Sequence, residues 1–294
     1  MDKPLSGPLI QRIDLGQDQI YTNHTGIKQM YNFYYQCAEI KNATVHVDLQ
    51  HVSWIDGNMC AVFGAILFKL QQENNLSFTI DFKQVSSKCN VLFRNGFINM
   101  KGIQPIANNT STTLPFKAFH PTQKDEFINY LYEELLIHDG MPKFNDETLG
   151  KLTDDLSELL SNINLHSETQ YPFFVCGQFY PKSHKVVFTV CDLGVGFLPK
   201  IKDKTKGTIN NAKDAILWAV DGNSTKKDTV GGINLKRMKK YFLESGGAFH
   251  IITGDAYWST ENLSTLIYPD GVTNMLKPFV GTTIHLIFNR KSLT

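Results

Sequence analysis

The chain has 294 residues, of which 42% are hydrophobic and 19% are charged, and its formal net charge is +1. This composition excludes an intrinsically disordered chain, and the length accommodates two domains of ordinary size. Because the charges nearly balance, no overall field favours nucleic acid or an anionic membrane, and we expect neither as a partner.

The cysteines and the apolar runs bear on the compartment. Five cysteines are scattered without a Cys-x-x-Cys pair, which argues against a disulfide framework and against a zinc site. The N-terminus lacks the pattern of a signal peptide. The longest apolar run, residues 59–68, is too short for a membrane span, which needs about twenty residues. We therefore expect a cytoplasmic protein with reduced thiols.

A polar stretch at 108–113, followed by Pro115, is the best candidate for a domain boundary. It divides the chain into residues 1–113 and 114–294. The first domain is expected to be α/β, because strand and helix patterns alternate along it. The expected strands are 45–49 and 78–82, and the expected helices are 58–72 and 85–95.

The second domain begins with two amphipathic helix patterns and continues mainly as strands. The expected helices are 122–138, 145–166 with Asn145 as N-cap, and 235–244. The expected strands are 173–180, 185–191, 248–253, 266–268 and 282–288. Residues 200–231, rich in Lys, Asn and Gly, are expected to form a loose segment. The predicted class is α+β, with helices on one face of a mostly antiparallel sheet.

The long helix carries one polar stripe. Glu158, Asn162 and His166 recur every four residues and therefore share a face. A carboxylate can accept a proton from an attacking water, and a carboxamide oxygen one turn away can bind Mg²⁺. Taken alone, the stripe is more typical of a solvated helix face than of a catalytic site.

A second motif follows the predicted strand 185–191. Asp192 stands at the end of that strand, and Gly194 and Gly196 come after it. Glycine allows close backbone approach, so the loop could wrap a flat ligand while the aspartate accepts a hydrogen bond from an exocyclic amine. An Asp-x-Gly-x-Gly segment also arises by chance.

Two further glycine segments complete the set. Gly231 and Gly232 precede a predicted helix, where backbone N–H groups and the helix dipole favour a phosphate. A surface loop before an ordinary helix N-terminus would have a similar sequence. Gly281 and Thr282 begin the last strand, where a hydroxyl could face a base or simply start the strand.

These four segments, in this order, resemble the signature of GHKL ATPases, the fold of gyrase, Hsp90 and the histidine kinases. The local sequence of the motifs most resembles that of the bacterial anti-sigma-factor serine kinases. The resemblance implies that Glu158 is the catalytic base, that Asn162 holds Mg²⁺, that Asp192, Gly194, Gly196 and Thr282 bind adenine, and that Gly231 and Gly232 belong to an ATP lid. The family usually has another glycine at Asn234, whose side chain is expected to crowd the phosphates.

Residues 8–105 resemble STAS domains, the fold of anti-sigma-factor antagonists, with the best match at 47–58. Antagonists carry a phosphorylatable serine at the end of this segment, whereas Gly57 and Asn58 occupy the corresponding positions. The resemblance implies a docking or regulatory domain without that phospho-switch.

Three functions follow from these patterns. The first is an Mg-ATP-dependent ATPase or serine/threonine protein kinase with a protein partner. The second is a nucleotide-sensing module that regulates a partner without useful turnover. The third is an interaction protein that binds no nucleotide. A homodimer is compatible with the first two, while a sensor kinase is disfavoured because no dimerising helical hairpin precedes the ATP domain.

Overall fold

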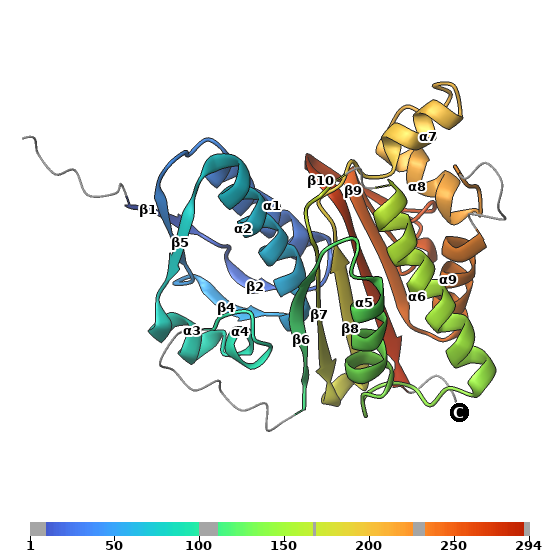
Figure 1. Ribbon diagram of the computed structural model, residues 1–294, viewed down its shortest axis with the longest axis horizontal. Helices are drawn as coiled ribbons and strands as arrows, with labels where there is room; N and C mark the ends of the chain where they lie inside the picture. Colours follow the sequence, from blue (N-terminus) through green and yellow to red (C-terminus); the bar gives the residue numbers. More distant parts are fainter. Residues whose placement is uncertain (1–9, 100–110, 167–168, 226–232, 291–294) are drawn as a thin grey trace, which may run out of the picture.

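The computed structural model describes residues 10–99, 111–166, 169–225 and 233–290, and the side chains of 160–166 are outside the description. It contains a small parallel layer in the first half and a larger antiparallel sheet in the second (Figure 1). The expected mixture of helices and strands is confirmed at this level.

The first half alternates strands and helices. Three strands form a parallel sheet in the order β1-β3-β5, and β2 pairs with β4 in parallel. The elements are β1 (Ile10–Asp14), β2 (Asp18–Ile20), α1 (His24–Ala38), β3 (Thr44–Asp48), β4 (Val52–Ile55), η1 (Gly57–Met59), α2 (Cys60–Asn74), β5 (Ser77–Ile80), α3 (Phe82–Lys88) and α4 (Val91–Arg94).

The predicted elements of this half are confirmed with one correction. The strands at 45–49 and 78–82 and the helix at 58–72 appear with small shifts as β3, β5 and α2. The single helix expected at 85–95 is wrong, because Cys89, with φ −123° and ψ 36°, leaves the helical region and separates α3 from α4.

The second half is built on one sheet of five antiparallel strands, in the order β6-β7-β8-β10-β9. The elements are β6 (Thr113–Phe119), α5 (Lys124–Tyr130), the π-helix η2 (Leu131–Leu136), α6 (Asp146–His166), β7 (Phe173–Tyr180), η3 (Pro181–Ser183), β8 (Lys185–Cys191), α7 (Leu198–Lys204), α8 (Ala212–Val220), α9 (Ile233–Glu244), β9 (Ala248–Ser259), η4 (Asn262–Ser264) and β10 (Val272–Asn289).

Helix α6 begins where the sequence predicts. The side-chain oxygen of Asn145 accepts a hydrogen bond from the Thr148 backbone N–H at 2.8 Å, which satisfies a donor that the helix itself cannot pair. Leu152, Leu156 and Leu159 recur at helical spacing and are buried. Their burial holds α6 on the sheet and leaves the opposite face to polar residues.

Two expectations for this half are wrong. The segment 200–231 is not loose as far as 225, because α7 and α8 lie within it. Asn211 caps α8 by accepting from the Asp214 N–H at 2.8 Å, and Ala215 and Ile216 are fully buried. The strand expected at 266–268 is absent, since Leu266 is 100% exposed and packing does not reward an extended conformation there.

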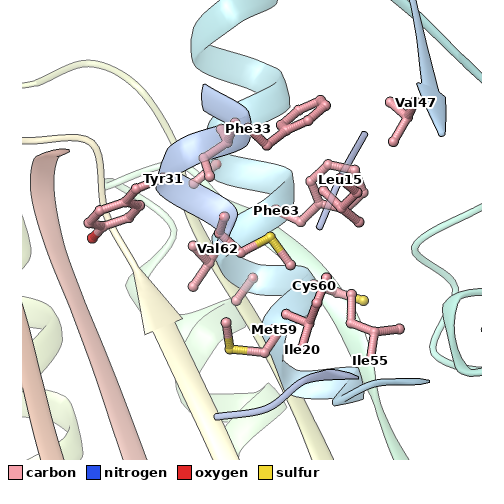
Figure 2. Close-up of a cluster of buried hydrophobic side chains, with 14 of the residues drawn as sticks. Leu15, Ile20, Tyr31, Phe33, Val47, Ile55, Met59, Cys60, Val62 and Phe63 are labelled. Carbon is pink, nitrogen blue, oxygen red and sulfur yellow. The ribbon is translucent and has the colours of Figure 1, made fainter. Parts of the chain in front are cut away.

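The sheet is covered on both faces. The helices α5, α6, α8 and α9 of the second half pack on one face, and α1 and α2 of the first half pack on the other (Figure 1). The expectation of helices on one face holds only for those of the second half. Figure 2 shows the core that the first half builds around α1 and α2, and the same cluster includes Phe174, Cys176 and Ile252 from the sheet.

Polar contacts fix the two halves against each other. Asn58 is fully buried, and its Nδ2 donates to Thr189 Oγ1 on β8 at 2.9 Å. The Gln178 side-chain oxygen on β7 accepts a hydrogen bond from the Gly57 backbone N–H. Gly57 and Asn58 therefore lie inside the interface between the halves.

The described helices include none that is both long and apolar enough to cross a membrane. All five cysteines are free and buried.

Gln178→Ala tests the interface. The substitution leaves the buried Gly57 N–H without its partner, and we expect a loss of about 1–3 kcal/mol in the free energy of unfolding. Urea denaturation should show one transition for both halves, because they share a core. Gln36→Ala, at an exposed position on α1, is the matched control. Equal stability of the two variants, or two separate transitions in the wild type, would contradict this description of the interface.

Candidate functional site

The end of β8 places a carboxylate inside the protein. Asp192 is 5% exposed, its Oδ1 accepts a hydrogen bond from the Gly194 N–H at 2.7 Å, and its own N–H donates to the Thr282 carbonyl at 2.9 Å. Burial raises the pKa of Asp192 to about 6, against the opposing effect of hydrogen bonds from the Gly194 and Thr282 backbones. A buried carboxylate with few donors around it is suited to accept a hydrogen bond from a ligand.

Two glycines let the surrounding backbone close on Asp192. Gly196 has φ +72° and Gly281 has φ +80°, a region that residues with a side chain rarely adopt. A Cβ on Gly281 would lie 2.0 Å from the Asp192 carbonyl oxygen, and a Cβ on Gly196 would lie 2.4 Å from Thr253 Oγ1. The loop can therefore keep this shape only with glycine at both positions.

Thr253 ties the loop to the sheet, and the sequence analysis missed this residue. It is 3% exposed, its Oγ1 donates to the Gly281 carbonyl at 3.0 Å, and it accepts from the Phe197 N–H at 3.3 Å. Thr253 also pairs with Thr282 in the β9–β10 register. The available signal was Gly254, since a glycine inside a strand pattern often marks a bulge or a close backbone approach.

Helix α1 packs against the same region from the sheet face that the first half of the chain covers. Tyr31 is buried, and its ring centroid lies 4.9 Å from that of Phe279 on β10. In Figure 2 the Tyr31 ring points away from the other labelled residues and toward the sheet. The first half of the chain thus contacts β10 two residues before Gly281.

The residues predicted on α6 form a second group. Glu158 is half-buried. One turn before it, Asp155 is 6% exposed and is bound by Asn234 and Arg237 of α9. Asn162 lies one turn after Glu158, but its side chain and that of His166 are outside the described residues, as are Gly231 and Gly232 altogether.

The Asn234 side chain forms a hydrogen bond with helix α6. Its Nδ2 donates to the Asp155 carbonyl oxygen at 2.8 Å, and only 1% of the residue is exposed. The side chain is therefore turned toward α6 and held there. The expectation that it crowds a phosphate stays a prediction.

The topology brings the two groups to one edge of the sheet, by which we mean the row of strand ends where β8 finishes and β7 begins. Cys191, the last residue of β8, pairs with Phe174 near the start of β7. Helix α6 ends at His166, shortly before β7 begins at Phe173. The C-terminal part of α6 and the Asp192 loop consequently lie at the same edge, which is the upper one in Figure 1.

The composition of this edge suits an uncharged heterocycle better than a metal at Asp192. No cluster of three or more His, Cys, Asp or Glu side chains that could hold a metal ion occurs in the described part of the chain. A metal between phosphates and Asn162 would involve a side chain outside that part. The Asp192 carboxylate is a described group at this edge that can accept a hydrogen bond from a ligand.

Asp192→Asn tests how much the buried, ionised carboxylate lowers the free energy of unfolding. Folding favours the protonated acid, so its stabilising contribution is full below about pH 4 and is lost as the pH rises through about 6. The asparagine variant avoids this loss. We expect it to be more stable than the wild type by about 2 kcal/mol at pH 7.5 and by much less at pH 4. Urea denaturation at both pH values measures the difference, and a destabilised variant at pH 7.5 would contradict the description.

Comparison with known proteins adds no relative. No protein-family model matches the sequence, and no curated protein or solved structure matches the chain.

Proposed function

We propose that this chain binds Mg-ATP at the edge of the sheet formed by the Asp192 loop, with its phosphates directed toward α6 and the start of α9. One observation carries the proposal: a buried aspartate, framed by Gly196 and Gly281 in conformations that exclude side chains, at the sheet edge where α6 ends. Asp192 accepts from the adenine amino group, and Gly194, Gly196 and Thr282 shape the pocket around the base.

The roles at the phosphate end follow from the helix pattern. Glu158 would polarise or deprotonate the attacking water or hydroxyl, and Asn162 would hold Mg²⁺, which would supply positive charge at the phosphates. Phosphoryl transfer depends mainly on positioning and charge neutralisation. The proposed activity is therefore that of an ATPase or a serine/threonine protein kinase acting on a protein partner, with Gly231 and Gly232 in a lid.

A second function is favoured by the contact with the first half. Tyr31 of α1 packs against Phe279 of β10, with 4.9 Å between the ring centroids, two residues before Gly281, so a nucleotide at Asp192 acts on a strand that the first half touches. A nucleotide-sensing module would use this contact to change how the first half docks to a partner. Turnover is not needed for that role.

The base preference tests the adenine pocket. Adenine presents an amino group where guanine presents a carbonyl oxygen, which a carboxylate repels. We expect calorimetry to show ATP binding at least about tenfold tighter than GTP, because a buried polar group left unpaired costs about 1–3 kcal/mol. Asp192→Asn should remove most of this binding. Asp203→Ala, an exposed carboxylate on α7, is the control. Equal affinity for both nucleotides would rule out Asp192 as the contact.

Glu158→Gln decides between turnover and sensing. Loss of a general base is expected to lower phosphate release or transfer by about 10²- to 10⁴-fold, with Mg-ATP affinity unchanged. The control is Glu147→Gln on the same helix, where the glutamate is exposed and pairs with Lys151. An unchanged rate in the Glu158 variant, or no measurable turnover in the wild type, favours the sensing module.

A further inference from the structure

Two separate backbone segments meet at the Asp192 edge, and the side chain of Thr253 joins them. The first segment is the loop that leaves β8, and the second is Gly281 in β10. The Thr253 hydroxyl on β9 donates a hydrogen bond to the Gly281 carbonyl at 3.0 Å and accepts one from the Phe197 N–H at 3.3 Å. A hydroxyl has one proton and two lone pairs, so it can make both bonds at once. We refer to Phe197, Thr253 and Gly281 as the Thr253 bridge.

The bridge supplies a hydrogen bond that the sheet does not. The β9–β10 register shifts between Phe279 and Thr282, which leaves Gly281 outside the regular ladder. An extra residue in a strand is left without its ladder bond, and such irregularities are frequent beside functional sites. Gly196 is needed as well, because a Cβ there would lie 2.4 Å from the Thr253 hydroxyl oxygen. The bridge therefore does not follow from regular strand pairing.

The bridge anchors one end of the Asp192 loop. At the other end, the Asp192 N–H donates to the Thr282 carbonyl at 2.9 Å. Between these anchors, the Gly194 N–H donates to Asp192 Oδ1 at 2.7 Å. In the described part of the chain only this oxygen of the carboxylate has a hydrogen-bond partner, so Oδ2 is left for a ligand. The position of Oδ2 thus depends on a loop that is held at both ends.

Base discrimination at a carboxylate requires that water be kept out. A guanine carbonyl is rejected only where no water can take the place of the missing donor, because an unpaired buried polar group is costly. A loop anchored at one end only would move away from Gly281 and let water reach the carboxylate. An adenine amino group would then lose its advantage over the guanine carbonyl.

We propose that Thr253 determines the base specificity of the nucleotide site. Its hydroxyl holds the loop after β8 against Gly281, so that the Asp192 carboxylate meets the base in one fixed position and without water. Thr253 acts as a positioning residue and does not touch the base. This inference rests on the proposed function, and it names the residue that sets the preference for adenine.

Calorimetry with ATP and GTP tests the bridge in the wild type, Thr253→Val and Thr253→Ser. Valine has nearly the shape of threonine without its hydroxyl. Thr253→Val should therefore lose about tenfold in ATP affinity, the size expected when one polar contact is lost. Its GTP affinity should stay within about twofold, because the guanine carbonyl accepts no hydrogen bond from the carboxylate in either protein. Thr253→Ser keeps the hydroxyl and should keep the ATP-to-GTP affinity ratio within about threefold of the wild-type value.

The control is Thr260→Val, which removes another buried threonine hydroxyl, one that accepts from the Phe249 N–H at 2.9 Å near the start of β9. It should lower stability without changing the ratio of the two affinities. Thr253→Ala takes the place of Thr253→Val if the valine variant folds poorly. A wild-type ATP-to-GTP ratio in the Thr253 variant, or an equal loss for both nucleotides, would overturn the specificity role. A wild type that binds neither nucleotide, or both equally, would instead overturn the proposed function, and the role of Thr253 with it.

Discussion

The burial of one antiparallel sheet on both faces is the constraint on which the rest of the structure depends. Strands β7 and β8 are buried along most of their length, because helices of the second half cover one face and α1 and α2 cover the other. Buried strands have their backbone groups paired in the ladder. A ligand site that needs free backbone and polar side chains can therefore form only at an edge where strands end.

The edge at the end of β8 offers a ligand a polar side chain and closely approaching backbone. Asp192 is buried at the cost of a raised pKa, and Gly196 and Gly281 adopt conformations that a side chain would obstruct. Such features reduce stability or restrict sequence without improving the core. Perturbed carboxylates tend to gather at functional sites, and glycine allows the close backbone approach seen at Gly196 and Gly281, so these features support the proposal of a ligand at this edge.

The sequence predicted the elements whose signals are local. Helix α6 has both a capping asparagine and a long leucine periodicity, and the β7–β8 hairpin has two apolar runs around a turn, so these elements appear within a few residues of their predicted positions. Helix α8 was missed because its short apolar run lies within a segment dominated by Lys, Asn and Gly. The strand at 266–268 was wrong because local apolar residues there find no partner to pack against.

The candidate site was predictable only in part for a similar reason. Asp192, Gly194, Gly196 and Thr282 could be named from short motifs, and the structure brings them together. Thr253 joins them through contacts with Gly281 and Phe197, which are 28 and 56 positions away, and no local pattern reports such contacts. The coverage of the second sheet face by α1 and α2, and the contact of Asp155 with Asn234, are likewise long-range and depend on how the helices pack.

A crystal structure with Mg²⁺ and a non-hydrolysable ATP analogue tests the central claim most directly. The account predicts that the adenine amino group lies about 2.8–3.0 Å from the Asp192 carboxylate, with the phosphates between α6 and the start of α9. A nucleotide bound elsewhere, or a base that turns its amino group away from Asp192, would contradict the assignment of this edge as an adenine pocket.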